Sequence, residues 1–226
     1  MTTDAGASGA PSSKEANGDG GKTDGPPGRA GPETEKFAAP SLRGRHVYLR
    51  PLTAGDFPYL QRVETSTELA FRWRLRGATP SPEQWAQTMW HQVLAQYLVV
   101  GALRPKPIGL VTVYRPNFQD GHAYLAAVRF ERPSPSPLMI LGVSLFVRYV
   151  FTCWDFRKLY MELPEFNLSQ FESGLGRYFE LEGRLRDHFY FAGRYWDQVT
   201  LAIYREVWER EGSRLDLARG TRSTVA

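Results

Sequence analysis

Apolar and polar side chains alternate over residues 46–52, and this spacing predicts a strand. The apolar positions of residues 57–66 recur with helical spacing and predict a helix. Ser81 followed by Pro82 is a typical helix start, because serine caps the first N–H groups and proline fits the first turn. Apolar residues about four positions apart extend this second predicted helix to Leu94. The first part of the chain is therefore predicted to form one strand and two helices.

Strand and helix patterns continue through the second half of the chain. Three strand-like segments, separated by turn-forming residues, predict an antiparallel meander over residues 97–103, 108–114 and 123–130. An apolar helix, a strand, a polar helix and two long strands are predicted next, over residues 138–151, 158–163, 167–178, 180–191 and 195–204. The order β-α-α-β-β-β-α-β-α-β-β indicates an α+β fold in which four helices flank one sheet.

The segment from residue 137 to residue 154 is almost continuously apolar, and its length is close to the roughly 18 residues that a membrane-spanning helix needs. Arg148 lies inside it, and Arg132 and Lys158 stand near its two ends. These charges favour a helix buried in a protein core, with no membrane as a partner. Because the helix is apolar on every side, it needs a second surface beyond the sheet, either a flanking helix or another subunit of a homodimer.

Composition divides the chain into three parts. The first 40 residues contain eight glycines, five prolines and no valine, isoleucine or leucine. Such a segment buries too little apolar surface to offset the entropy of ordering, so residues 1–40 are expected to be a disordered tail. Residues 41–212 are expected to form one domain, and the polar residues 213–226 a C-terminal tail.

Charge and cysteine content narrow the functional classes. The chain carries a net charge of +4, and because the first 40 residues sum to −2, the rest carries +6. This charge is compatible with an anionic ligand, but no long basic stripe argues for nucleic acid as a partner. Cys153 is the only cysteine, which is typical of a reducing compartment and predicts a cytoplasmic protein. The four histidines show no metal-ligand spacing, so no metal is expected.

Two segments carry a resemblance to a known family. The run FNLSQFESGLGRYFELEGRLRDHFYFAGRYWDQVTLAIYREVWE begins at Phe166, and the run LRGRHVYLRPLTAGDFPYL begins at Leu42. Together with the predicted order of elements, they resemble the GNAT superfamily of acyl-CoA N-acyltransferases. The chain is most similar to the subgroup that acetylates ribosomal-protein alanine amino termini. The resemblance spans about residues 42–210 and implies a mixed, mostly antiparallel seven-stranded sheet.

The resemblance also implies a reaction and a donor. GNAT proteins transfer an acyl group from acetyl-CoA or another acyl-CoA to an amine, with the donor held between two splayed strands. The implied acceptor here is a small-molecule or peptide amine. The family pattern places the donor beside the fourth strand, the following loop and helix, and the segment after the fifth strand, which implies contacts with Val128, Phe130, Ser134, Ser136, Leu138, Met139 and Asn167.

The expected pyrophosphate-binding loop departs from the family pattern, because its two glycine positions align with Pro135 and Pro137. Proline has no N–H and fixes φ near −65°, so the loop cannot form the usual set of amide donors. Losing two charge-assisted hydrogen bonds, at about 1.5–3 kcal/mol each, weakens donor binding by about 3–6 kcal/mol. Two interpretations stay open: a rigid connector without a ligand, or an altered phosphate site. A phosphopantetheine donor on an acyl-carrier protein would need less from this loop.

Side chains for catalysis are predicted from their positions on the elements. Glu162 lies on the predicted fifth strand, where the family often has a carboxylate that deprotonates the amine. Tyr178, at the end of the predicted polar helix, is either a general acid or a core or surface tyrosine. Arg74 and Arg76 belong either to an anion-recognising strip or to a solvated face, and Trp85 lines an acceptor pocket or packs in the core. The alternative to an enzyme is a non-catalytic binding module of the same fold that has lost ordinary acetyl-CoA binding.

Overall fold

The computed structural model describes residues 42–66, 69–70, 73–130 and 136–217, so the predicted tail over residues 1–40 and the candidate Ser134 lie outside the described residues. The described strands are β1 (Val47–Pro51), β2 (Val93–Gly101), β3 (Pro107–Asn117), β4 (His122–Arg129), β5 (Lys158–Pro164), β6 (Glu180–Phe191) and β7 (Arg194–Tyr204). The described α-helices are α1 (Phe57–Glu64), α2 (Pro82–Thr88), α3 (Ser136–Cys153) and α4 (Arg205–Leu217). Short 3-10 helices are η1 (Ala54–Asp56), η2 (Glu165–Gln170) and η3 (Glu172–Gly174).

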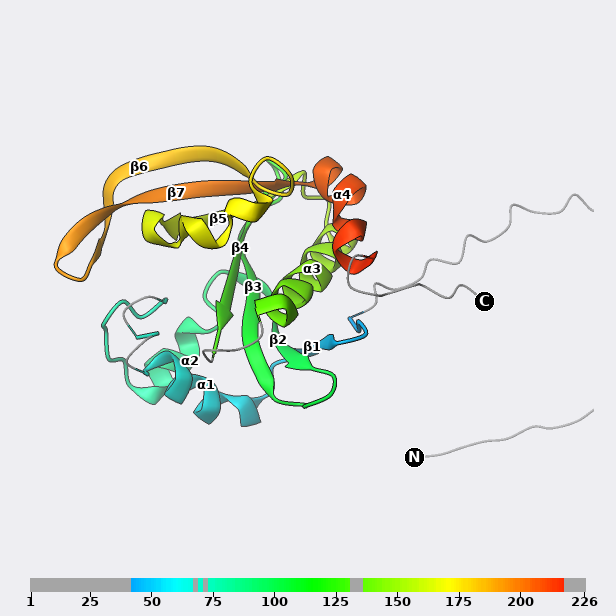
Figure 1. Ribbon diagram of the computed structural model, residues 1–226. Helices are drawn as coiled ribbons and strands as arrows, with labels where there is room; N and C mark the ends of the chain where they lie inside the picture. The colour runs from blue at the N-terminus through cyan, green and yellow to red at the C-terminus, as the bar shows by residue number, and fades with distance from the viewer. Residues whose placement is uncertain (1–41, 67–68, 71–72, 131–135, 218–226) are drawn as a thin grey trace, which may run out of the picture. The chain divides into compact units, whose positions relative to one another are not determined.

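The strands form one sheet in the order β1-β2-β3-β4-β5-β7-β6. Neighbouring strands are antiparallel except β4 and β5, which are parallel, and β2, β3 and β4 form the predicted meander. The β6–β7 hairpin projects beyond the other strands (Figure 1) and turns at Ala192 and Gly193. Both residues have positive φ, as a two-residue hairpin turn requires. The α+β class and the mixed, mostly antiparallel seven-stranded sheet are confirmed.

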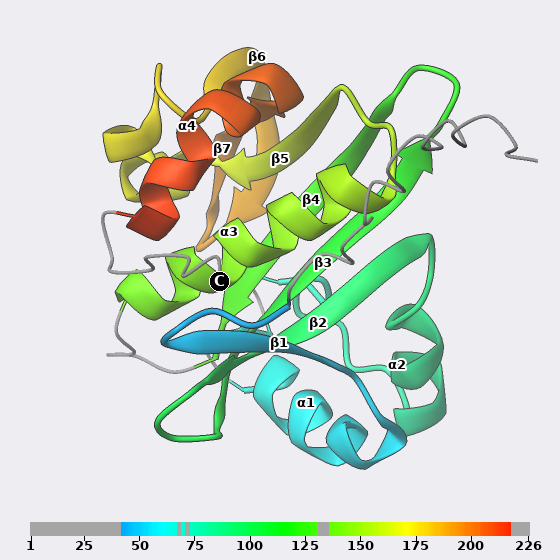
Figure 2. The same cartoon turned by 90° about the vertical axis from the view of Figure 1, so that its right-hand side faces the viewer.

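Helices cover both faces of the sheet (Figures 1 and 2). On one face, here the α3 face, α3 packs over buried residues such as Leu125, and α4 adds Trp208 to the same core. On the other, the α1/α2 face, Leu60 of α1 and Trp85 of α2 pack over Leu110. Trp85 is only 1% exposed, so of its two interpretations the core position is correct.

The apolar helix α3 begins at Ser136, two residues before its predicted start. Gly142 lets it lie directly on β2, because a β-carbon at this position would overlap both methyl groups of Val99. Its other side contacts α4 (Figure 2), so a flanking helix supplies the second surface that an all-round apolar helix needs. Within the described ranges, the structure contains no helix with both the length and the apolar character of a membrane span.

The second predicted helix is too long. α2 ends at Thr88, and β2 begins at Val93, so Val93 and Leu94 belong to a strand. Their apolar spacing continues that of the helix, but Val93 pairs with Tyr114 of β3. The conformation here is determined by pairing with a neighbouring strand, and the spacing of apolar residues gives no information about such pairing.

Two predictions near the C-terminus are also wrong. Residues 167–178 form no α-helix; they contain parts of η2 and η3, and Gly174 and Gly176 interrupt any longer helix, since glycine is a poor helix former. The helix α4 was not predicted, and it continues into residues 213–217, which composition assigned to a polar tail. Most residues of α4 are polar, so no apolar pattern marks it in the sequence, but one of its few apolar residues, Trp208, packs in the α3-face core.

Candidate functional site

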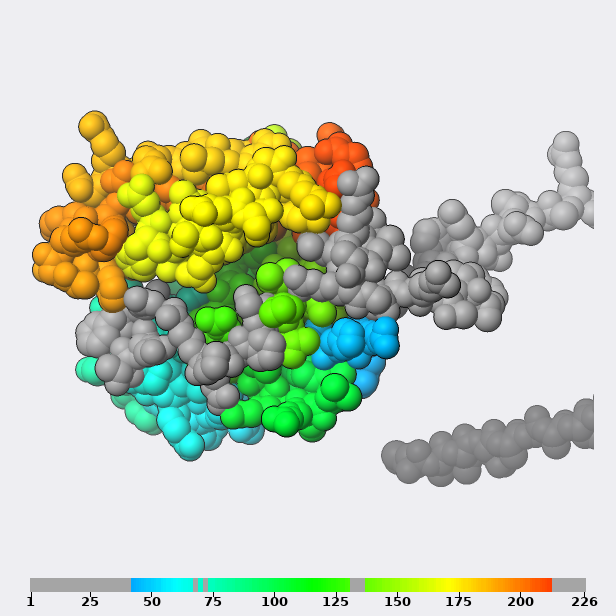
Figure 3. Space-filling model, in the orientation of Figure 1, coloured from blue at the N-terminus to red at the C-terminus, as the bar shows by residue number. Residues whose placement is uncertain are grey.

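A gap opens in the sheet between β4 and β5. The two strands pair only from His122 to Tyr124 on β4 and from Lys158 to Tyr160 on β5. Beyond these residues β4 continues to Arg129 and β5 to Pro164 without pairing. Figure 3 shows a hollow between the yellow segment that carries η2 and the green segments below it. The splayed pair of strands that the resemblance implies is therefore present.

Backbone groups of β4 line one edge of this gap. The N–H of Phe130 donates to the carbonyl of Ile108 on β3 at 3.1 Å. Because backbone groups alternate in direction along a strand, the N–H and C=O groups of Val128 also point toward β3. Those of Ala127 and Arg129 point the opposite way, into the gap. The two residues that the sequence analysis named here, Val128 and Phe130, are therefore residues whose backbone groups face away from the gap.

The side chains of Val128 and Phe130 also point away from the α3 face. Val128 is 7% exposed within the α1/α2-face core, and Phe130 packs against the same core. The ring of Phe130 lies edge-on to that of Tyr59 of α1, with centroids 5.8 Å apart. These two residues shape the wall between the gap and the α1/α2 face.

The start of α3 lies after the open end of β4. In a helix that begins at Ser136, the N–H groups of residues 136 and 138 have no acceptor within the helix, whereas residue 137 is a proline without N–H. The side chains of Leu138 and Met139 pack against the α3-face core. Met139 lies over Gly109, where a β-carbon would come within 2.5 Å of its sulfur. Leu138 therefore offers a backbone donor, and Met139 anchors the helix to the sheet.

Asn167 lies in η2, directly after β5, and borders the gap from the side opposite β4. Its side-chain Oδ1 accepts a hydrogen bond from Gln170 Nε2 at 3.2 Å. The structure thus places Asn167 directly after β5, the strand that separates from β4.

Aromatic rings cluster on the α1/α2 face where β4 and β5 separate. The ring centroids of Tyr124 and Tyr160 lie 5.5 Å apart, and that of Tyr114 lies 5.7 Å from Tyr124. His122 extends the cluster, with its ring 5.4 Å from Tyr160. Tyr114 and Tyr160 were missed in the sequence, where nothing marks them except that they share a register with Tyr124 on neighbouring strands.

Glu162 lies on β5 two residues beyond Tyr160 and is exposed. Within the described parts of the chain it has no hydrogen-bond or ion-pair partner. Burial raises the pKa of both Tyr114 and Tyr124, and the negative charge of Glu162 is the second cause of this increase. A carboxylate with no partner among these residues therefore stands beside two protonated tyrosine hydroxyls at the gap.

A partly buried ion pair lies beside the aromatic cluster. Lys158 Nζ donates to both carboxylate oxygens of Glu182, at 2.9 and 2.8 Å, and Tyr204 also donates to Glu182. The Lys158 ammonium lies 4.6 Å from the ring centroid of Tyr160. Burial alone would raise the pKa of Glu182, but the hydrogen bonds from Lys158 and Tyr204 hold it below its ordinary value. This network fixes the side of Tyr160 that faces away from the gap.

Arg74 and Arg76, in the segment between α1 and α2, lie in different environments. Arg74 Nε lies 3.5 Å from Oε1 of the buried Glu64, and its Nη1 lies 3.2 Å from Met89 Sδ. The Arg76 guanidinium stacks 4.1 Å from the ring centroid of Phe189 on β6. The solvated-face interpretation is wrong for Arg74, which lies against the buried Glu64, whereas Arg76 is exposed and stacks on the ring of Phe189.

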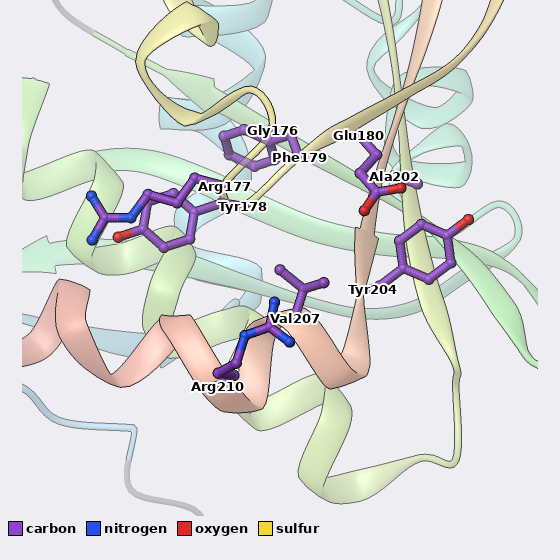
Figure 4. A pocket seen from close by; sticks show the side chains of 9 residues that line it. All are labelled: Gly176, Arg177, Tyr178, Phe179, Glu180, Ala202, Tyr204, Val207 and Arg210. Carbon is purple, nitrogen blue, oxygen red and sulfur yellow. The ribbon is translucent and has the colours of Figure 1, made fainter.

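Tyr178 lies away from the gap. It lines a pocket with Arg177, Glu180, Tyr204 and Arg210 (Figure 4), and the residues of this pocket belong to β6, β7, α4 and the segment before β6. None of the lining residues is on β4 or β5. The structure therefore does not bring together the two candidate catalytic side chains, Glu162 and Tyr178.

The fold resembles those of known proteins, although the sequence alone matches none of the families or curated proteins searched. A search with protein-family models finds no match, and a comparison with curated proteins finds none either. Solved structures do match: the spermidine N-acetyltransferase of Vibrio cholerae, in complex with CoA and spermine, has a TM-score of 0.62 at 19% identity, covering 72% of this chain and 98% of that one. A GCN5-related N-acetyltransferase from Brucella melitensis has a TM-score of 0.61 at 18% identity, covering 80% and 85%. With its splayed β4 and β5 and these structural relatives, the chain has the GNAT fold.

Proposed function

We propose that the protein transfers an acyl group from a CoA thioester to an amine. The observation that carries the proposal is the gap between β4 and β5, which has backbone groups of β4, unpaired within the described residues, along one edge, the Glu162 carboxylate of β5 at the other, and tyrosine rings where the two strands separate. The amine nitrogen forms a bond to the thioester carbonyl carbon, and the carbon–sulfur bond breaks. The amine loses a proton to Glu162, directly or through water, and the departing thiolate takes up a proton.

The donor lies on the α3 side of the gap in this proposal. The backbone groups of Ala127 and Arg129 hydrogen-bond its amide-containing arm, since both point into the gap. Asn167 acts from the opposite edge, and the N–H groups of Ser136 and Leu138 meet the phosphates at the start of α3. This start offers fewer N–H donors than a glycine-rich loop, so binding rests more on the β4 edge, and an acyl-carrier protein stays a second donor to be tested.

The acceptor lies on the α1/α2 side, beside Glu162 and the tyrosine rings. An ammonium group is attracted by aromatic faces and by a carboxylate, so this surface suits a cationic amine. The structural relative from Vibrio cholerae is a spermidine N-acetyltransferase, which supports a small-molecule amine as the acceptor class. A peptide amine, as in the ribosomal-protein subgroup, is the other acceptor to be tested.

The test measures thiol release by the purified full chain with acetyl-CoA and a panel of small amines and peptides. We expect free thiol and N-acetyl product in equal amounts, for at least one cationic amine, above the rate without protein. Acetylated acyl-carrier protein, which carries the acetyl group as a phosphopantetheine thioester, replaces acetyl-CoA in a parallel arm. Donor binding without thiol release from either donor would contradict the proposal and indicate the non-catalytic binding module.

A further inference from the structure

The α1/α2 face of the sheet is arranged in three rows across its strands. The first row is apolar and includes Leu98 and Leu110, which belong to the core under α1 and α2. Two residues further along the strands, Gln96 and Thr112 are paired on β2 and β3, and Thr112 is also paired with Ala126 on β4. The tyrosine cluster forms the third row. A polar row therefore separates the apolar core from the aromatic end of the gap.

The polar row contains buried atoms that lack hydrogen bonds. Gln96 is 3% exposed and Thr112 is 4% exposed, and neither Gln96 Oε1 nor Thr112 Oγ1 has a hydrogen-bond partner within the described residues. Trp73 Nε1, on the helical side of the same face, is buried without a hydrogen bond to any described residue as well, and Glu64 Oε1 has only the ion-pair contact with Arg74. Buried polar atoms are nearly always hydrogen-bonded in proteins, so a group of unpartnered ones calls for an explanation.

The polar row reaches the gap at the strand position of Glu162, the predicted general base. Ala126 lies two residues beyond Tyr124 on β4, and Glu162 lies two residues beyond Tyr160 on β5, so they stand at the same level on the two edges of the gap. Ala126 is half-buried and carries only a methyl group next to Thr112. Because adjacent strands lie about 4.8 Å apart, Thr112 and Gln96 are about 5 and 10 Å from β4.

The two oxygens of the row without hydrogen bonds from described residues, Gln96 Oε1 and Thr112 Oγ1, determine which chemical groups a ligand must offer. Gln96 Nε2 already donates to the carbonyl of Met89 at 2.9 Å, which orients the amide and leaves Oε1 to accept. The Thr112 hydroxyl both accepts and donates. A partner of Gln96 Oε1 must therefore carry an N–H or O–H group, and an alkyl chain alone leaves both oxygens unpaired.

We propose that Thr112 and Gln96 select the acceptor amine by binding a second hydrogen-bond donor on it, on the β3 side of the gap. The inference rests on the proposed function and names the specificity end of the same site. The acceptor class is a diamine or an amino alcohol, whose second ammonium or hydroxyl group donates to Gln96 Oε1 and contacts Thr112 Oγ1. The reacting nitrogen stands at the gap beside Glu162.

The test compares three acceptors of equal length with acetyl-CoA: a four-carbon diamine, a four-carbon amino alcohol and an alkylamine. We expect kcat/KM for the first two to exceed that of the alkylamine by about tenfold, since a site with unpaired polar groups discriminates against a ligand that cannot pair them. The variant Thr112→Val keeps the shape and removes the hydroxyl. It is expected to lower kcat/KM about three- to tenfold for the two donor-bearing amines and to leave the alkylamine unchanged.

Two controls separate the outcomes. Thr152→Val removes a hydroxyl from α3, where Thr152 Oγ1 donates to the carbonyl of Arg148, and is expected to leave all three acceptors unchanged. The Tm of Thr112→Val is expected to equal or exceed that of the unmodified chain, because the lost hydroxyl has no partner among the described residues. Equal effects of Thr112→Val on all three amines, or a lower Tm, would overturn the specificity role and leave the transferase proposal standing. Thiol release with none of the amines would overturn both.

Discussion

The two faces of the sheet differ in how completely their polar groups are paired. On the α3 face the interior is apolar, and α3 fits so closely that glycines occur where it touches β2 and β3. On the α1/α2 face, single polar atoms of buried side chains lack hydrogen bonds within the described residues, and the Glu162 carboxylate lies beside tyrosine rings. A face built only for stability would resemble the first. The difference indicates that the α1/α2 face is shaped for a polar ligand, and that the α3 face holds the gap in a fixed form.

The largest effect is expected at Glu162. The substitution Glu162→Gln keeps the size of the side chain and removes the group that takes the proton from the amine. Since general base catalysis contributes about 10²–10⁴-fold, kcat is expected to fall by about two orders of magnitude or more. The measurement is thiol release at saturating donor, with Tm recorded to exclude unfolding.

Tyr178→Phe is the matched comparison for Glu162→Gln. Tyr178 lies in the pocket beside α4 and not at the gap, so its hydroxyl is expected to contribute less than about twofold to kcat. A loss for Tyr178→Phe as large as that for Glu162→Gln would assign the proton donor to Tyr178 and contradict the separation of the two sites.

The close fit of α3 is tested at Gly142. In Gly142→Ala the new methyl group overlaps Val99, and overpacking of this kind costs about 1–3 kcal/mol. Alanine favours a helix over glycine by about 1 kcal/mol, so the net loss in unfolding free energy lies toward the lower part of this range. Urea unfolding measures it. Gly55→Ala, whose β-carbon would have its nearest neighbour at 3.7 Å, is the control and is expected to be near neutral.

A smaller effect concerns acid stability at the edge of the α1/α2 face. Arg50 donates to both carboxylate oxygens of Asp56, at 2.9 and 2.7 Å, and these hydrogen bonds help hold the pKa of Asp56 at about 2, below its ordinary 3.8. Because the folded-state pKa is lowered, the contribution is fully present above pH 4 and is lost as the pH falls toward 2. After solvent screening it is about 1–2 kcal/mol.

The measurement for Asp56 is unfolding free energy against pH. The variant Asp56→Asn is expected to lose this contribution at neutral pH and to show a flatter curve between pH 4 and 2. Parallel curves for the two proteins over that interval would contradict the role of the Arg50–Asp56 pair.

The fold was predictable from the sequence where local pattern and tertiary pairing agree. The strands of the meander, the apolar helix and the C-terminal hairpin have strong local signals, and the structure contains all of them. Val93 and Leu94 were misassigned because their spacing fits a helix while their partners are on β3. The helix α4 was missed because a single tryptophan, Trp208, supplies much of its anchoring in an otherwise polar segment.

The candidate site was predictable only in part. Glu162 was named from the predicted fifth strand and the family pattern, and the structure places it on β5 beside the gap. Thr112 and Gln96 were not found, since each is one polar residue in an apolar strand, and only the register across three strands shows that they share a row. The direction of the β4 backbone also depends on its pairing with β3, so the sequence selected Val128 where the structure favours Ala127.

The central claim is that the donor occupies the gap along β4 while the amine approaches from the other face. Hydrogen–deuterium exchange of the full chain with and without saturating acetyl-CoA tests it most directly. The account predicts slower exchange at the amides of Ala127 and Arg129 and in the first turn of α3, with no change around Tyr178 and Arg210. Unchanged exchange along β4, or protection confined to the pocket beside α4, would contradict it.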